Sequence, residues 1–384
     1  MTDFNYAQRL VHFQQLLEGV ADLAFLSVSA DLQYLVGVPR TTPNFGAIHH
    51  PGDWLEGAWI SADHDLALTL SRMTAVFGGL PDLDNADRRI LGDWDDPAGL
   101  VRDILRSFNL PQQPRVAIND RASAEALVAL QRIMPDATFI SASKILQELR
   151  VIKSAGEIAI MRQAGEITES AFAAVLAQLK HNMTELDVVA EVHYQLWRHG
   201  SPGSSFTPLL ENSGPNHPLI LGQPLEAWKR ELQPPVSVLF DFGAIYQGYC
   251  YDFGRTVFFG DPPPEAVRVH RLVMDSQAAG INAMRAGQVT AAEVDAVARQ
   301  VIEDAGYGEY FMHRLGHGIG LNVHEPPFLT AGDETVLREG MLFTVEPSIM
   351  QEKSFSARVE DIVLVSNDGG EPLTSGFQDL YIVD

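Results

Sequence analysis

Apolar and polar positions in the first 145 residues alternate with the periods of helices and strands. Residues 5–39 predict an amphipathic helix, with Leu10, Phe13 and Leu17 at helical spacing, then the strand AFLSVS and the segment DLQYLVGV. Alternating strands and helices continue to about residue 145, separated by proline- and glycine-containing segments such as GGLPDLDN and LPQQP. The pattern predicts a compact α/β domain.

The pattern changes around residues 146–153 to a charged helix, LQELRVIKS. A long helix is predicted to follow from Ser154, because Glu157 three positions later completes a capping-box signal. The chain of 384 residues is also too long for a single hydrophobic core to be the default. We therefore expect an N-terminal domain over residues 1–148 and a C-terminal domain over residues 149–384.

Two helical stretches of the second half are similar along their whole length. Residues 184–200 (TELDVVAEVHYQLWRHG) align without gaps with residues 290–306 (TAAEVDAVARQVIEDAG), 106 positions later. Each begins with an N-cap threonine, has an acidic residue three positions on, and ends in glycine. The alignment predicts an internal repeat, and chance similarity between two capped helices is the alternative.

Two aspartates flank a predicted hairpin in the segment LFDFGAIYQGYCYDFGRT. Because side chains alternate between the faces of a strand, a two-residue turn at 246–247 sets Asp241 directly opposite Asp252. A turn at 247–248 instead makes them diagonal neighbours on one face, roughly 7–8 Å apart. In these apolar surroundings the pair would repel unless a cation neutralised it. Ordinary acidic residues in a solvated turn are the alternative.

Glu346 in LFTVEPSI and Glu360 in ARVEDIVLV each interrupt an apolar run, where an unpaired carboxylate carries a large desolvation cost. With the two aspartates and one imidazole, they make a ligand set suited to two divalent ions such as Mn²⁺, Co²⁺, Fe²⁺ or Zn²⁺. Two such ions balance four carboxylates and can still bind one bridging hydroxide, since coordination lowers the pKa of water to about 7. The set predicts a metal-dependent hydrolase.

Three histidines lie in HRLGHGIGLNVHEPP. His313 and His317 are four residues apart, but the glycines between and after them make a helical zinc motif improbable and suggest a close approach of the backbone to a ligand. We expect His317 to bind metal and His324 to donate to a substrate carbonyl or tetrahedral intermediate. For His313, a part in the chemistry and a hydrogen-bonded structural role are both open.

The composition of the chain limits the binding partners and the cellular compartment that we expect for it. The chain has 27 Lys and Arg against 50 Asp and Glu, a formal charge of −23, which argues against a nucleic-acid partner. No apolar run reaches the length of a membrane span and the N-terminus lacks a signal-peptide pattern, so we expect a cytoplasmic protein with no membrane partner. The single cysteine, Cys250, fits a reducing compartment, as a buried spectator or a reactive thiol.

The chain resembles the pita-bread metallopeptidases, the family of prolidases, Xaa-Pro aminopeptidases and methionine aminopeptidases. The segments DFGAIYQGYCYDFGRT, HRLGHGIGLNVHEPP, TVEPSI and ARVED are similar to the family's metal-site segments in order and spacing. Arg9 and LQYLVGV more weakly resemble its creatinase-like N-terminal domain. The resemblance implies an α/β creatinase-like N-terminal domain and an α+β pita-bread C-terminal domain with a pseudo-twofold internal repeat.

The resemblance also implies the roles of the ligands. Asp241 would bind the first metal, Asp252 and Glu360 would bridge the two ions, and His317 and Glu346 would complete the second site. Manganese is the expected ion, with cobalt, zinc or iron as alternatives. The implied enzyme is a metallo-exopeptidase, an Xaa-Pro dipeptidase or aminopeptidase that acts on small peptides.

Other residues are expected to act on the substrate. By the same resemblance, Glu346 is also the acid/base, His324 assists the substrate carbonyl, and Arg358 meets a substrate carboxylate. The family further implies a homodimer, in which His50 and Trp54, from a loop that also contains His49, would border the neighbouring subunit's pocket. A locally packed tryptophan with exposed histidines is the alternative.

Two positions depart from the family pattern and leave the substrate open. Gly254 stands where the family usually has threonine, and Leu221 stands where relatives place an active-site histidine. His217 lies nearby, out of register, and is the candidate to replace that histidine in substrate binding. A small non-peptide amide or cyclic metabolite, as in ectoine-hydrolase-like relatives, is therefore the alternative substrate. A metal-free binding module is a third reading, disfavoured because all five ligands are present.

Overall fold

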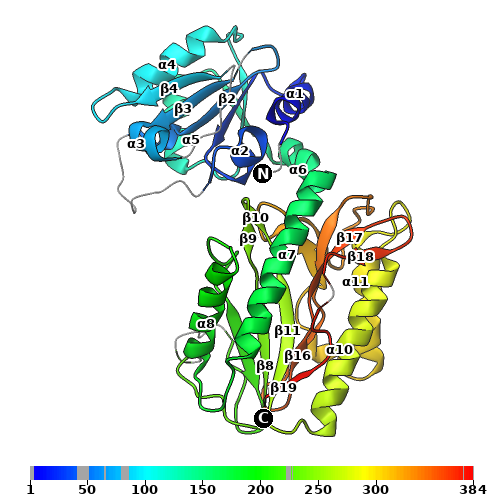
Figure 1. Ribbon diagram of the computed structural model, residues 1–384. Coiled ribbons are helices and arrows are strands. Elements are labelled where there is room, and N and C mark those ends of the chain that lie inside the picture. The colour runs from blue at the N-terminus through cyan, green and yellow to red at the C-terminus, as the bar shows by residue number, and fades with distance from the viewer. Residues whose placement is uncertain are drawn as a thin grey trace. The chain divides into compact units, whose positions relative to one another are not determined.

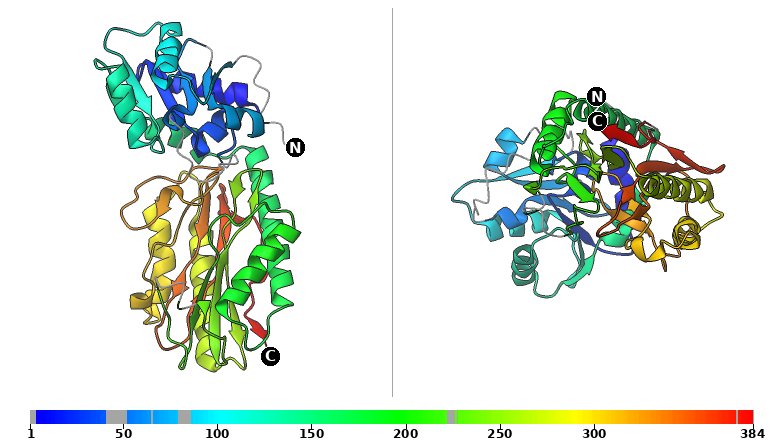
Figure 2. Two further views of the ribbon diagram at one scale, coloured as in Figure 1. Left: turned by 90° about the vertical axis from the view of Figure 1, so that its left-hand side faces the viewer. Right: turned by 90° about the horizontal axis from the view of Figure 1, so that it is seen from below.

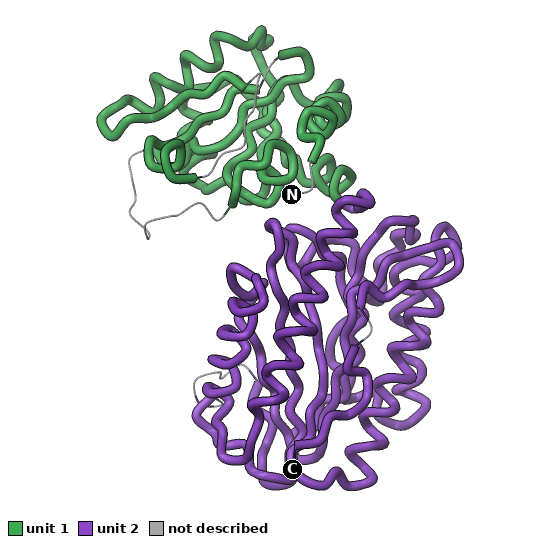
Figure 3. The backbone as a smooth tube through the Cα atoms, in the orientation of Figure 1, with its two compact units in different colours: residues 1–150 green, residues 151–384 purple. Residues whose placement is uncertain are grey.

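The computed structural model describes residues 4–40, 52–64, 66–78, 86–221, 226, 228–374 and 376–383. The chain divides into two compact units, residues 1–150 and residues 151–384 (Figure 3). The boundary expected after residue 148 lies two residues before this division. None of the described helices is both long and apolar enough to cross a membrane.

The N-terminal unit is an α/β domain built on a mixed six-stranded sheet in the order β4-β3-β2-β1-β5-β6. Strands β1 and β5, β5 and β6, and β3 and β4 pair in parallel, while β2 is antiparallel to both of its neighbours. Its core is apolar, with the rings of Phe25 and Trp59 4.4 Å apart. The strands are β1 (Leu23–Ser27), β2 (Gly57–Ile60), β3 (Ala67–Ser71), β4 (Asp87–Leu91), β5 (Arg115–Ile118) and β6 (Thr138–Ser141). The helices are α1 (Tyr6–Leu17), α2 (Ala30–Val36), η1 (Asp53–Leu55), α3 (Arg72–Phe77), α4 (Pro97–Ser107), α5 (Ala124–Ile133) and α6 (Ser143–Val151).

The C-terminal unit places two pairs of long helices outside its strands. Helices α7 and α8 lie on one side of the strands, and α10 and α11 lie on the other (Figures 1 and 2). The main sheets have the orders β19-β11-β8-β7 and β13-β12-β14-β17-β18, and two-stranded pairs join β9 to β10 and β15 to β16. The helices are α7 (Ala155–Leu176), α8 (Glu185–Arg198), α10 (Pro264–Ala283), α11 (Ala291–Asp304) and η2 (Gly308–Tyr310). The strands of the first half are β7 (Leu209–Ser213), β8 (Val236–Phe242), β9 (Ile245–Tyr246), β10 (Tyr249–Cys250) and β11 (Phe253–Phe259). The remaining strands are β12 (Gly316–Gly318), β13 (Glu325–Leu329), β14 (Leu342–Val345), β15 (Ser348–Ile349), β16 (Ala357–Arg358), β17 (Asp361–Val365), β18 (Gly370–Pro372) and β19 (Tyr381–Val383).

The two halves of this unit repeat one arrangement. Helices α8 and α11 both begin with a capping box, in which Thr184 and Asp187, or Thr290 and Glu293, exchange hydrogen bonds between side chain and backbone. Each follows a longer helix and leads to a pair of antiparallel strands, β8 with β11 or β14 with β17. The expected fold class, with its internal repeat, is confirmed.

Side chains of β8 alternate between the face of the sheet that packs on the helices and the opposite face. Phe240 and Phe242 point toward α7, where their rings lie 5.4 Å and 6.1 Å from the ring of Phe172. Asp241, between them, therefore points to the opposite face. Burial of these aromatic rings against α7 fixes the orientation of the strand, and with it the direction of the carboxylate.

Candidate metal centre

The hairpin that carries the two aspartates turns at Gln247 and Gly248. Both residues have positive φ, 48° and 86°, as a two-residue turn matching the twist of the strands requires. The strand register that follows sets Asp241 opposite Gly254, so that Asp252 lies diagonally from Asp241. Of the two predicted registers, the one with the turn at 247–248 is confirmed and the one at 246–247 is wrong.

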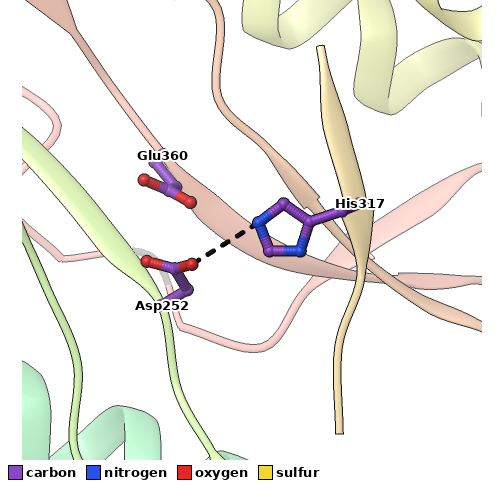
Figure 4. Close-up of side chains that lie close together, drawn as sticks. All are labelled: Asp252, His317 and Glu360. Atoms are coloured by element: carbon purple, nitrogen blue, oxygen red, sulfur yellow. Dashed lines mark ion pairs between the residues drawn. The ribbon is translucent and has the colours of Figure 1, made fainter. Parts of the chain in front are cut away.

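Three predicted ligands converge in the interior of the C-terminal unit. One ligand atom each from Asp252, His317 and Glu360 lies within 4.8 Å of the others, and the three side chains point toward one another (Figure 4). His317 Nε2 is 3.6 Å from Asp252 Oδ2 and 3.4 Å from Glu346 Oε1. Asp252, His317 and Glu360 expose only 4%, 2% and 1% of their surface. The fourth carboxylate, Asp241, contacts Asp252 and completes the group.

The ligands meet because the two sheets join beside them. Asp252 directly precedes β11 and Glu360 directly precedes β17, and the backbone of Gly254 pairs with that of Glu360. The bridge consists of hydrogen bonds of 3.3 Å and 2.9 Å between their amide and carbonyl groups. A Cβ on Gly254 would lie 2.8 Å from Glu360 Cβ, so this glycine permits the close approach. The departure from threonine at this position therefore has a steric consequence at the cluster.

Burial makes the cluster unfavourable as a group of bare anions. The pKa of Asp252 is raised well above its ordinary value by burial and by repulsion from Asp241 and Glu346. Burial and the neighbouring carboxylates raise the pKa of Glu360 in the same direction, and burial raises that of Glu346 to about 7. Asp252 Oδ1 and Glu360 Oε2 are buried oxygens to which no group in the described part of the chain donates a hydrogen bond. Carboxylate oxygens without partners at the centre of such a group fit divalent cations, which would satisfy both the charge and the lone pairs.

His317 is held in the form that binds metal. Its Nδ1 lies 3.0 Å from the carbonyl oxygen of Gly318 and donates to it, which leaves the Nε2 lone pair directed at the carboxylates. Burial, together with the neighbouring His324, lowers the pKa of His317 to about 3, so the imidazole is neutral. A Cβ on Gly316 would lie 1.9 Å from the Thr344 carbonyl oxygen. This glycine therefore allows β12 to approach the backbone of the neighbouring strand. The sequence had instead suggested that the glycines here let the backbone approach a ligand.

A pocket of about 580 Å³ opens beside the cluster. Its lining residues are His313, Arg314, His324, Phe328, Thr330 and Glu346, which include all three predicted catalytic side chains. The ring of His324 lies 4.2 Å from that of His317. Burial lowers the pKa of His313 to about 4, and its Nδ1 is 2.7 Å from the Arg314 carbonyl oxygen. A substrate in this pocket would meet the imidazoles and Glu346 at the same time.

Arg358, the predicted binder of a substrate carboxylate, is engaged by side chains of the protein. Its Nη1 pairs with Asp241, its Nη2 lies 3.7 Å from Glu211 Oε2, and its Nε donates to Ser348 Oγ at 2.8 Å. Sequence reasoning missed Glu211, because nothing local indicates that β7 pairs with β8 in the register that places Glu211 near Arg358. Arg358 as a whole is only 7% exposed, and it is not among the residues that line the pocket.

The other two predicted substrate-binding residues are His217 and His50. His217 is buried 3.8 Å from Glu185 Oε1, after the end of β7 where Ser213 pairs with Ser237. His217 is not among the residues that line the pocket beside the cluster, and Leu221 is 51% exposed. His49 and His50 lie outside the described residues, and Trp54 packs on the N-terminal core.

A hydrogen-bonded network behind the ligands was not predicted. Gln277 of α10 donates to the carbonyl oxygens of Val345 and Val359 at 3.1 Å and 3.3 Å, and to Asp361 Oδ2 at 3.0 Å. Arg255 donates to Asp361 Oδ1 and to the carbonyl oxygen of Glu360, both at 2.6 Å. The network thus holds the backbone immediately before Glu346 and around Glu360. The adjacent Glu-Asp pair was its one signal in the sequence.

Comparison with known proteins agrees with this site. Residues 159–367 match the metallopeptidase family M24. The Xaa-Pro dipeptidase of Lactobacillus delbrueckii subsp. lactis is 34% identical over 294 residues, 76% of this chain and 78% of that protein. A dipeptidase structure from Pyrococcus horikoshii superimposes with a TM-score of 0.85 at 31% identity, covering 98% of this chain and 100% of that one. A prolidase structure from Thermococcus sibiricus gives 0.88 at 26% identity, covering 99% and 100%. The chain therefore belongs to the metallopeptidase family M24 and has its prolidase-like pita-bread fold.

Proposed function

We propose that this metallo-exopeptidase is an Xaa-Pro dipeptidase or aminopeptidase that hydrolyses the amide bond before proline with two divalent ions. The observation that carries the proposal is the convergence of the four carboxylates and His317, with unpaired oxygens on Asp252 and Glu360, beside a pocket of peptide size. Relatives named Xaa-Pro dipeptidases support the substrate class. When bound, the ions would supply a bridging hydroxide near neutral pH and polarise the scissile carbonyl.

The residues of the pocket have separate tasks in this proposal. The ions would be held by five side chains, those of Asp241, Asp252, His317, Glu346 and Glu360. Their buried carboxylates cannot all be ionised without cations, which is why ion binding and the ionised state of the cluster are coupled. Glu346 also faces the pocket, where its carboxylate is placed to accept and return a proton.

His324 is the proposed hydrogen-bond donor to the substrate. Its side chain lines the pocket next to the His317 ring, so that it faces the carbonyl oxygen of a peptide bound at the cluster. A donor there stabilises the charge that develops on this oxygen during attack. His313 lines the same pocket with a buried Nε2 that has no hydrogen-bond partner among the described residues, which makes it a second contact for the substrate.

Metal removal and replacement test the proposal. The protein is treated with a chelator, dialysed, and assayed with Ala-Pro and Gly-Pro after addition of Mn²⁺, Co²⁺, Zn²⁺ or Fe²⁺ singly. We expect activity to vanish with the metal and to return, with Mn²⁺ most effective, at two ions per chain. Asp252→Asn, as the matched variant, should neither bind two ions nor regain activity. Absence of activity with every ion would reject the proposal.

A small non-peptide amide or cyclic metabolite is the second candidate substrate. Leu221, half exposed where relatives place a histidine, and Gly254, which carries no hydroxyl beside Glu360, favour it. The same metal-loaded protein should then cleave cyclic amides faster than proline dipeptides. Metal binding by itself separates both candidates from a metal-free binding module, and sedimentation of the active protein tests the proposed homodimer.

A further inference from the structure

A dipeptide substrate brings a negative charge into an acidic site. Its carboxylate would lie near four ligand carboxylates and Glu211, so a cationic side chain is needed to hold it. Two arginines flank the site, Arg358 behind the cluster and Arg314 in the pocket wall. Their surroundings differ, and the difference decides which of them can receive a ligand.

The charge of Arg358 is already matched within the protein. It contacts the carboxylates of Asp241 and Glu211, and its Nε donates to Ser348. When Asp241 binds metal, Glu211 still remains beside the guanidinium. A substrate carboxylate at Arg358 would have to displace an internal acid from a nearly buried position, at the cost of leaving that acid without a partner.

Arg314 has no such partner. Across the described parts of the chain, no ion pair or hydrogen bond reaches its guanidinium, and its Nε is buried without an acceptor. The guanidinium carbon lies 4.7 Å from the centre of the Phe328 ring, a cation–π contact that helps to hold the group in place. It is the one cation among the six pocket-lining residues, which also include His324 and Glu346.

We propose that Arg314 binds the C-terminal carboxylate of a dipeptide in the 580 Å³ pocket and thereby selects dipeptides over longer peptides. The inference rests on the proposed peptidase function. A longer peptide places a neutral amide where the dipeptide has its carboxylate, so the guanidinium donors would lose their charged acceptor. The contact with Phe328 holds the guanidinium at the pocket, where its planar fork can make a two-pronged contact with a carboxylate.

The test pairs a change in the enzyme with the matching change in the substrate. Kinetics of the Mn²⁺-loaded wild-type, Arg314→Met and Arg314→Lys proteins are measured on Ala-Pro and on Ala-Pro amide. We expect Arg314→Met to lower kcat/KM for Ala-Pro about 30- to 100-fold, mainly through KM, and for the amide less than about threefold. Arg314→Lys should lie between wild type and Arg314→Met on Ala-Pro. An equal loss on the two substrates would overturn the proposal.

Control variants separate this contact from general damage. Arg358→Gln should lower activity on both substrates equally, since it disturbs Asp241, whereas the exposed Arg271→Gln on α10 should change neither. Inhibition by L-proline should weaken in Arg314→Met while the weak inhibition by L-prolinamide stays constant. If wild type cleaves neither substrate, the peptidase function fails and this inference fails with it. If wild type cleaves both substrates, and Arg314→Met weakens cleavage of the two substrates equally and inhibition by the two inhibitors equally, this inference alone fails.

Discussion

Gln277→Met should weaken the metal centre without touching it. The side chain is 3% exposed and donates from α10 to the carbonyl oxygens of Val345 and Val359 and to the Asp361 carboxylate. Methionine keeps nearly the same length and volume, so the change removes the amide donor with little loss of packing. The two carbonyls directly precede Glu346 and Glu360, which are then held less firmly.

The size of the effect follows from the hydrogen bonds that the Gln277 amide donates. A hydrogen bond to a charged group contributes about 1.5–3 kcal/mol and one to a carbonyl about 1 kcal/mol, with a further cost when the acceptor stays buried. Since these terms are not additive, we expect a loss of about 3 kcal/mol in the free energy of unfolding. For a unit of this size that lowers Tm by roughly 6–12 °C. Misplaced ligands should also reduce Mn²⁺ affinity about 10- to 100-fold.

Thermal unfolding in the presence of chelator measures the first effect, and calorimetric titration with Mn²⁺ measures the second. Gln300→Met is the matched control, because the amide of Gln300 contacts only Asp304 at the surface of α11. That control should shift stability by less than about 0.5 kcal/mol. If the two variants show the same Tm and the same Mn²⁺ affinity, Gln277 does not position the ligands and the reasoning is wrong.

Two further predictions concern the ligands themselves. Gly254→Ala puts a Cβ 2.8 Å from Glu360 Cβ, and we expect at least a tenfold loss of Mn²⁺ affinity by calorimetry, whereas Gly203→Ala, whose Cβ meets no atom within 4 Å, should bind Mn²⁺ normally. The pKa of Glu346 is raised from 4.5 to about 7 in the fold, so its contribution favours folding below pH 4.5 and is lost as pH rises through about 7. Between pH 4.5 and 8, the free energy of unfolding of the metal-free wild type should therefore fall by about 3 kcal/mol relative to that of Glu346→Gln, since one pKa unit is about 1.4 kcal/mol. A difference in Tm between the two proteins that stays constant with pH would contradict this.

Local signals in the sequence determined much of the architecture. The capping residues of α7, α8 and α11 mark where those helices begin, because a side chain three residues away satisfies the free amide groups of the first turn. Carboxylates inside apolar runs likewise indicated the buried carboxylates of the cluster, since an unpaired buried charge is too costly to occur without a partner. These features depend on neighbours along the chain, and the sequence therefore contains them.

The tertiary structure alone decided which side chains meet. The hairpin pattern allowed two turns, and the pairing of β8 with β11 selected the diagonal placement of Asp241 and Asp252. Pairing of β7 with β8 placed Glu211 near Arg358, while Arg314 lines the pocket. Strand register and the face of a sheet are set by contacts between distant segments, so sequence spacing could suggest these residues but could not assign their partners.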